Sequence, residues 1–100
     1  MGATNYALRI NTPVAIGSKT TTSTAAVTAL SLGGAVRIWV KGTEDTRIRF
    51  GDSSVAAPTS GDALLTADVD YVFDVLPVHT HARIRRDGST DTTVRFMRVG

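Results

Sequence analysis

Two histidines one residue apart are the sharpest candidate for chemistry in this chain. His79 and His81 flank Thr80, and residues i and i+2 of a β-strand face the same way, so both imidazoles could reach one metal ion. A tetrahedral zinc site takes about four ligands, and the chain has no cysteine and no third histidine. A carboxylate such as Asp74, or a repeat of the pair around a symmetry axis, would have to complete the site. We therefore expect two half-exposed strand residues and no resident metal or cofactor.

Basic side chains are expected on the same sheet face as the two histidines and would make that face positive. Such a face could bind phosphate or an acidic protein surface. A single-stranded nucleic-acid binder also needs aromatic side chains for base stacking, and only Trp39 is available for that role. Nearby acids would partly neutralise the face, so we expect a solvated face with cross-strand ion pairs, with an acidic protein partner as the alternative and no nucleic acid. The basic residues are Arg37, Arg47, Arg49, His79, His81, Arg83, Arg85 and Arg95, and the acids are Glu44, Asp45, Asp70, Asp74, Asp87 and Asp91.

Trp39 is a large aromatic residue on the polar side of its predicted strand. Outward aromatic side chains often anchor interfaces. The alternative is a ring that lies over arginine side chains or is covered by the N-terminal segment, and the sequence favours neither.

No residue pattern indicates catalysis. There is no Gly-x-Ser-x-Gly motif to expose a nucleophile and no phosphate-binding glycine loop. Asp68, Asp70 and Asp74 lie near a predicted turn without the apolar neighbours that would raise a carboxyl pKa for acid–base work. We expect a protein that binds and is not an enzyme.

Alternation of apolar and polar residues predicts β-strands through most of residues 35–99. Residues 35–41 and 46–50, joined by a short polar loop, are typical of a β-hairpin. Further strands are expected near 63–66, 71–75, 78–85 and 92–99, the last two as a closing hairpin. Segment 23–32 fits either a strand, which its threonines favour, or a helix capped by the following glycines. The predicted core is Val36, Ile38, Val40, Ile48, Phe50, Phe73, Val75, Ile84, Val94 and Phe96.

The bulk properties are those of one small domain. The chain has 100 residues, of which 42% are hydrophobic and 20% charged, with a formal net charge of +2. No apolar run approaches the roughly 20 residues of a membrane span, so no membrane association is expected. Several short strands with regularly spaced turns predict an all-β domain, a small antiparallel β-sandwich or jelly roll, with an extended N-terminal arm.

The N-terminal segment differs in composition from the rest. Residues 1–22 contain Arg9 and Lys19 but no acid. Their two apolar clusters, residues 6–10 and 14–16, are too small to offset roughly 1–2 kcal/mol of backbone entropy per ordered residue. The same clusters could add a strand to a neighbouring molecule. We therefore predict an arm or short edge strands over 1–22, a sandwich over 23–100, and self-association. The arm's candidate interface residues are Tyr6, Leu8, Ile10, Val14 and Ile16.

The order of motifs along residues 23–99 resembles a group of small virion proteins of tailed phages, encoded beside capsid genes or among neck and tail genes. The likeness rests on a Ser-Thr-Ala-Ala-Val-x-x-Leu segment at 23–30, Ala-Val-Arg-Ile-x-Val at 35–40, and Arg-Phe-Gly-Asp-Ser-Ser-Val at 49–55. An aromatic strand at 71–75, a Thr-His-Ala-Arg-Ile strand at 80–84 and a closing hairpin complete it.

The resemblance implies a non-enzymatic virion protein assembled in the host cytoplasm. The leading expectation is a head decoration or cement subunit bound to the lattice of the major capsid protein. The alternatives are a neck, tail or fibre component that contacts other virion proteins or host surface glycans, and a cytosolic binding module. Loop 52–62 is expected to project from the sandwich as a contact surface. The remaining candidate interface residues are Trp39, Asp52, Ser53, Ser54, Val55, Pro58, Arg83 and Arg85.

Overall fold

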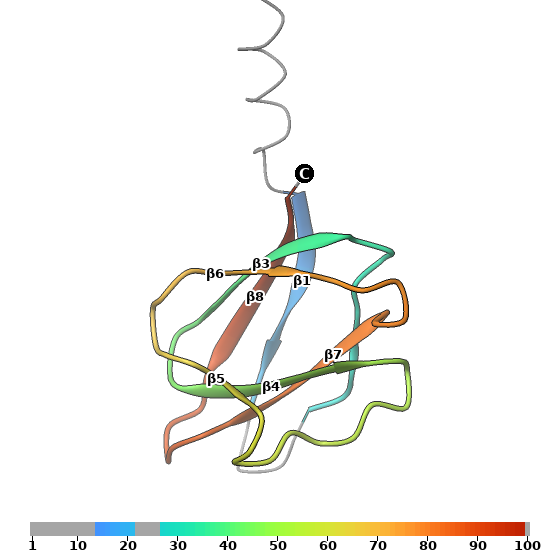
Figure 1. The fold of residues 1–100 in the computed structure, drawn as a ribbon. Coiled ribbons are helices and arrows are strands. Elements are labelled where there is room, and N and C mark those ends of the chain that lie inside the picture. Colours follow the sequence, from blue (N-terminus) through green and yellow to red (C-terminus); the bar gives the residue numbers. More distant parts are fainter. Residues whose placement is uncertain (1–13, 22–26, 100) are drawn as a thin grey trace, which may run out of the picture.

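The structure is built from β-strands and the loops that join them. The computed structural model describes residues 14–21 and 27–99, and these contain eight strands and no helix (Figure 1). The predicted all-β class is confirmed. The strands are β1 (Val14–Thr20), β2 (Leu30–Ser31), β3 (Arg37–Gly42), β4 (Thr46–Gly51), β5 (Ala63–Leu65), β6 (Tyr71–Asp74), β7 (His81–Arg86) and β8 (Thr93–Arg98).

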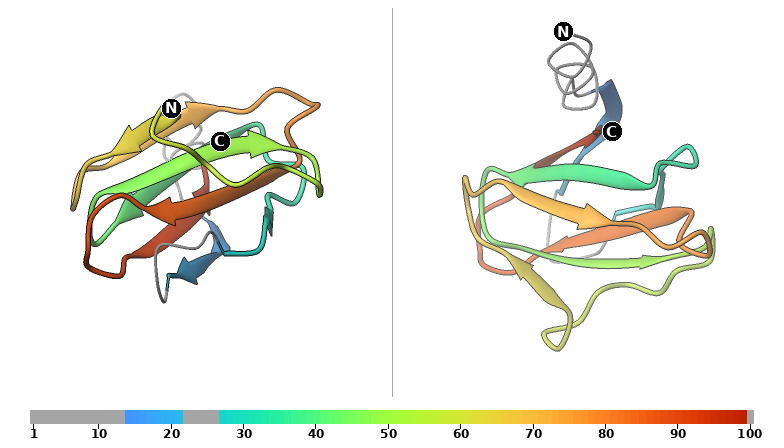
Figure 2. Two further views of the ribbon diagram at one scale, coloured as in Figure 1. Left: turned by 90° about the horizontal axis from the view of Figure 1, so that it is seen from below. Right: turned by 45° about the horizontal axis from the view of Figure 1, so that its top comes forward.

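The strands form two four-stranded sheets that pack against each other (Figure 2). The first sheet has the order β1-β8-β3-β6 and the second the order β2-β7-β4-β5. Strand β1 pairs with β8, β2 with β7, β3 with β6 and β4 with β5, always antiparallel. The chain is thus arranged as a long antiparallel ribbon wrapped around one core, which is the eight-stranded jelly roll.

Two connections that the sequence predicts as hairpins cross between the sheets instead. Strand β3 belongs to the first sheet and β4 to the second, and β7 and β8 are divided in the same way. The hairpin prediction is wrong. A hairpin and a corner between two sheets both need a short polar loop, so the loop sequence does not distinguish them. Alternation shows which side chains face inward, but it does not show in which sheet a strand lies.

Both sheets contribute inward-facing side chains to one core. Phe50 and Phe73 lie at its margin, with ring centroids 5.1 Å apart in an edge-to-face arrangement. All the predicted core residues except Val36 are buried or pack against this core. The least exposed of them are Ile38, Val40, Ile48, Ile84, Val94 and Phe96.

Val36 is the exception, with 66% of its surface exposed. Strand β3 begins only at Arg37, after a turn in which Gly33 and Gly34 both have positive φ. Ala35 takes the inward position instead. The two-residue period therefore fails at Val36 because it holds only within the regular strand.

The segments at the N-terminal side form short edge strands. Of the predicted strand 23–32, only Leu30–Ser31 is regular, as β2, and residues 22–26 lie outside the described ranges. Strand β1 falls within the segment predicted as an arm or edge strands, and it pairs with β8 from Val14 to Thr20 with a register shift between Ala15 and Gly17. It is an edge strand of the first sheet.

A buried cluster of threonines joins the loops at one end of the sandwich. Thr21, Thr46 and Thr92 are fully buried. The hydroxyls of Thr46 and Thr92 lie 3.0 Å apart, and both reach the carbonyl oxygen of Glu44, at 2.8 and 3.2 Å. The backbone N–H of Thr92 donates to the Thr21 hydroxyl at 3.0 Å. Hydrogen bonds satisfy these buried polar groups, as burial requires.

Candidate interaction surfaces

Four arginines form a block on the outer face of the second sheet. Arg47 lies opposite Arg85 and Arg49 opposite Arg83 in the antiparallel pairing of β4 with β7. Like charges directly opposite each other on a sheet are destabilising. Nearby carboxylates and carbonyl groups must therefore compensate this block.

Loop 52–62 supplies much of that compensation. Arg49 forms an ion pair with Asp62 at 2.8 Å, and Arg47 donates to the Asp62 carbonyl at 3.0 Å. Arg83 donates to the carbonyl of Val55 at 3.1 Å and to that of Val27 at 2.9 Å. The arginines of the basic stripe therefore hold the loop and the segment before β2 against the sheet.

The prediction that loop 52–62 projects from the sandwich is wrong. Val55 is 8% exposed and Pro58 is fully buried, so the loop packs against the sheet at these two positions. A Cβ on Gly51 would lie 2.9 Å from side-chain atoms of Val55, which shows how closely the loop folds back on β4. The arginines and these apolar contacts explain why the loop is anchored.

Asp62 is the polar anchor of the loop. Its carboxylate accepts the backbone N–H of Thr59 at 2.7 Å and also pairs with Arg49. The hydrogen bond from Thr59, followed by the guanidinium of Arg49, holds the pKa of the Asp62 carboxyl below its ordinary value. The charged form of Asp62 therefore stabilises the folded loop.

The exposed start of the loop lies beside Arg83, another residue that the sequence predicts at an interface. Asp52, Ser53 and Ser54 are exposed, and the Asp52 carboxylate accepts the backbone N–H of Ser54 at 2.8 Å. Ser53, Ser54, Val55 and Arg83 line a shallow pocket of about 260 Å³ together with Thr28 and Ala29. The structure thus brings together four of the interface residues predicted from the sequence.

The two histidines do not form one site. Strand β7 begins at His81, so the strand predicted from Val78 is shorter than expected, and Val78 is 70% exposed. The ring of His79 stacks on Phe50 with centroids 6.3 Å apart, whereas Nδ1 of His81 lies 2.8 Å from the Thr80 hydroxyl. Within the described ranges, no group of three or more potential ligands could hold a metal ion.

An apolar row crosses the outer face of the first sheet. Trp39 lies between Val72 on β6 and Met97 on β8 in the strand pairing. Val72 is 60% exposed and Trp39 is partly buried. Ion pairs flank the row, Arg37 with Asp74 at 2.8 Å and Lys41 with Asp70 at 3.6 Å.

A pocket of about 320 Å³ opens beside Trp39 on the same face. Trp39 therefore has open space beside it that the sequence could not reveal. The other residues that line this pocket come from β3, β8, the loop after β3 and the loop before β6. They are Lys41, Gly42, Thr43, Asp68, Thr93 and Arg95.

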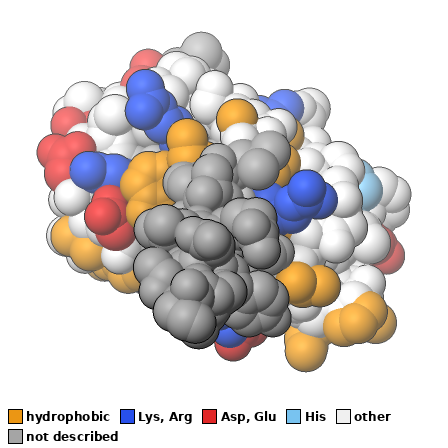
Figure 3. All heavy atoms as spheres, turned by 90° about the horizontal axis from the view of Figure 1, so that it is seen from above, with side chains coloured by type: hydrophobic (Ala, Val, Ile, Leu, Met, Phe, Trp, Pro, Cys, Tyr) orange, Lys and Arg blue, Asp and Glu red, His pale blue; other side chains and the backbone are white. Residues whose placement is uncertain are grey.

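Exposed aliphatic residues gather where the β2–β3 and β6–β7 connections meet. The backbone N–H of Val75 donates to the carbonyl of Val36 at 2.8 Å, which joins the two connections. Val36, Leu76 and Val78 are each at least 60% exposed. We call these three residues the apolar end. Seen from above, hydrophobic side chains reach the surface in several groups among charged ones (Figure 3).

The first residue of β1 lies near the apolar end. Val14 pairs with Arg98, and the next residue, Val99, donates its N–H to the carbonyl of Arg37 at 3.0 Å. One strand, β8, therefore separates the start of β1 from Arg37, the residue that follows Val36. Tyr6, Leu8 and Ile10, the other predicted residues of the arm, lie outside the described ranges.

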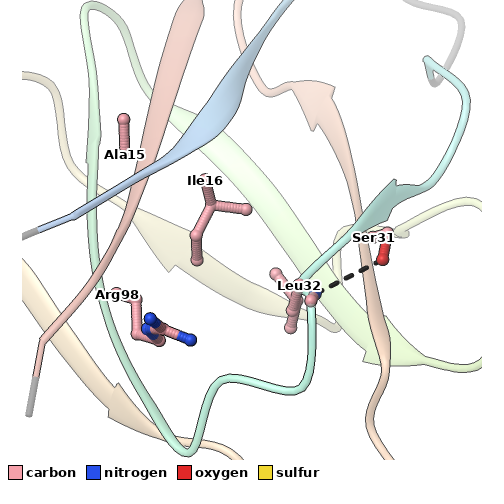
Figure 4. Close-up of a pocket in the computed structure, with 6 residues that line it drawn as sticks. Ala15, Ile16, Ser31, Leu32 and Arg98 are labelled. Carbon is pink, nitrogen blue, oxygen red and sulfur yellow. Dashed lines mark hydrogen bonds between the residues drawn. The ribbon is translucent and has the colours of Figure 1, made fainter.

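A third pocket, of about 290 Å³, lies between the edges of the two sheets (Figure 4). Ile16 and Leu32 form its apolar wall, Arg98 lies across from them, and Ala15 lies nearby on β1. Leu32 is part of the core and Ile16 packs against it. Ile16, a predicted interface residue, therefore contributes to the sandwich itself.

The strand order defines the chain as a jelly-roll domain. No family model, curated protein or solved structure matches this chain. No helix in the described part of the chain could cross a membrane. A jelly roll carries many functions, so the surfaces described above must carry the functional argument.

Proposed function

We propose that this protein is a non-enzymatic structural subunit of a tailed-phage virion, most specifically a head decoration subunit that binds the lattice of the major capsid protein. The sequence motifs that resemble small phage virion proteins support this role, and viral capsid proteins are among the users of the jelly roll. Assembly in the host cytoplasm and location in the virion follow from the same proposal.

The observation that carries the proposal is the apolar end. Val36, Leu76 and Val78 are 60–70% exposed. A domain of this size has a small core, and these apolar side chains lie outside it. Contiguous exposed apolar residues mark sites of protein association. Strand β1 begins one strand away from Arg37, the residue that follows Val36, and we expect the arm and the apolar end to contact the same neighbouring protein.

The basic face supports a protein partner rather than nucleic acid. Arg47 and Arg49 are paired with Asp87 and Asp62, and Arg83 is bonded to backbone carbonyls. Because these arginines are engaged within the fold, less positive charge is free to bind phosphates.

Quantitative mass spectrometry of particles of the phage that encodes the chain tests the proposal. A decoration subunit is expected in a copy number comparable with that of the major capsid protein. A few copies per particle would assign the protein to the neck or tail instead, and absence from the particle would refute the virion role.

A variant pair tests the surface. Val78→Ser should keep the melting temperature of the parent, because Val78 contributes little to the core, but it should reduce co-sedimentation with particles that lack the protein. Val72→Ser, at a residue that is 60% exposed on the outer face of the first sheet, is the matched control for Val78, which is 70% exposed. Equal attachment of the parent and Val78→Ser would show that the apolar end is not the contact.

A further inference from the structure

We propose that the pocket beside Trp39 binds a neutral pyranose sugar, such as the terminal residue of a glycan. The inference does not depend on the role in the virion. It rests on three features of the pocket: an aromatic wall, a balanced pair of unengaged charged groups, and a turn with positive φ that places Asp68 at the pocket.

The aromatic wall is the only tryptophan of the chain. Trp39 lies on β3 between two hydrogen-bonded strands, so the sheet fixes its backbone position at the pocket. One face of a pyranose presents C–H groups, which pack on the electron-rich face of an aromatic ring. A rigid aromatic wall with a few polar groups around it is the usual composition of a small-molecule site.

Two charged side chains at the pocket have no other role in the described structure. Neither the Arg95 guanidinium nor the Asp68 carboxylate forms a hydrogen bond or ion pair with another residue in 14–21 or 27–99. Lys41, the third charged lining residue, pairs with Asp70 at 3.6 Å. The unengaged charges of Arg95 and Asp68 therefore balance, and this balance favours a neutral ligand over an acidic or a basic one.

The chemistry of these two groups matches sugar hydroxyls. A carboxylate only accepts hydrogen bonds and a guanidinium only donates them, whereas a hydroxyl can do both. Asp68 would accept from one or two hydroxyls, and Arg95 would donate to a hydroxyl or ring oxygen. Thr43 adds a third group, because its oxygen accepts the Thr93 N–H at 2.9 Å and its own proton can be donated to a ligand.

Asp68 has an unusual backbone conformation. Its φ is 58°, the only positive φ of a non-glycine residue in the described ranges. Its N–H donates to the carbonyl of Gly42 at 2.8 Å, which fixes the turn at the pocket. Aspartate is one of the few non-glycine residue types that adopt this conformation as single residues, and the turn thereby places Asp68 at the pocket. The volume of about 320 Å³ lies at the small end of the range for ligand pockets, which suits one or two sugar rings.

Tryptophan fluorescence provides a direct test, because all of the signal comes from Trp39. The full chain is titrated with methyl glycosides of glucose, galactose, mannose and N-acetylglucosamine, and in a separate arm with glucuronic acid. At least one neutral glycoside should give a saturable change. Asp68→Asn, which keeps a residue that tolerates positive φ, and Arg95→Gln should each weaken that binding at least about tenfold.

Arg98→Gln is the matched control. Arg98 is an exposed arginine on β8, the strand of Arg95, but it lines the pocket between the edges of the two sheets. This variant should bind as the parent does. The proposal is overturned if no neutral glycoside changes the fluorescence, if glucuronic acid binds more tightly than the neutral sugars, or if Asp68→Asn and Arg95→Gln bind like the parent. A fluorescence change that depends on protein concentration alone would assign the surface to self-association and also overturn it.

Discussion

Replacing Thr92 by valine tests the buried threonine cluster at the end of the sandwich. Thr92 is fully buried, and its hydroxyl accepts the N–H of Glu44 at 3.2 Å and lies 3.0 Å from that of Thr46. Valine has nearly the same shape, so no cavity forms and the cost is almost wholly one of hydrogen bonds. An intramolecular hydrogen bond contributes about 1 kcal/mol net, and a buried N–H left without a partner costs about 1–3 kcal/mol.

We therefore expect Thr92→Val to lower the free energy of unfolding by about 2 kcal/mol, after the gain from burying an apolar group is subtracted. At about 4–8 °C per kcal/mol for a domain of this size, the melting temperature should fall by roughly 8–16 °C. Thermal unfolding followed by circular dichroism measures the change. Thr93→Val is the control, because among residues 14–21 and 27–99 the Thr93 hydroxyl bonds only to the exposed hydroxyl of Thr20.

A double-mutant cycle sharpens the test. If the hydroxyls of Thr46 and Thr92 form one network, the combined Thr46→Val and Thr92→Val variant should lose less stability than the sum of the single variants, by about 0.5–3 kcal/mol. Additive losses would refute the network. A Thr92→Val variant that melts like the parent would refute the whole argument.

Three further outcomes are expected. Phe96→Ala, which empties a fully buried position, should cost about 3–5 kcal/mol in chemical denaturation, and a loss below about 1 kcal/mol would contradict the core assignment. The pKa of Asp62 is lowered in the folded state, so Asp62→Asn should be less stable than the parent at neutral pH. That difference in melting temperature should shrink as the pH falls through the ordinary carboxyl range and below it, whereas a difference that grows in acid would contradict the assignment. Deletion of residues 2–13 should leave the melting temperature unchanged and weaken attachment to particles, whereas deletion of residues 2–20 should also destabilise the sandwich because it removes β1 from β8.

The sequence predicted the inward-facing residues well because burial on one side of a strand leaves a two-residue period. Ile38, Val40 and Phe96 needed no knowledge of the strand order. The pairing of strands could not be predicted in this way. Strand β1 pairs with β8 at the other end of the chain, and nothing local distinguishes that partner from any other strand of similar length.

The candidate surfaces were less predictable because they depend on how loops fold back. The turn formers of residues 52–62 indicated irregular structure, but they did not show that Arg83 would bind a loop carbonyl. One signal was present: Asp62 follows Thr59 by three residues, the spacing of a side chain that closes its own turn. The pocket beside Trp39 left no such signal, because Asp68 and Arg95 come from segments distant in sequence.

The anchored loop changes which part of the molecule is free to meet a partner. From the sequence, the arginine stripe was expected to be a solvated face with cross-strand ion pairs, and loop 52–62 a separate contact surface. In the structure they are largely one assembly, since Arg47 and Arg49 bind Asp62 and Arg83 binds the carbonyl of Val55. A partner that took over these arginines would have to release the loop and expose Val55 and Pro58 to water, which would offset much of the binding energy. The apolar end carries no such cost, and association with a protein partner should therefore concentrate there.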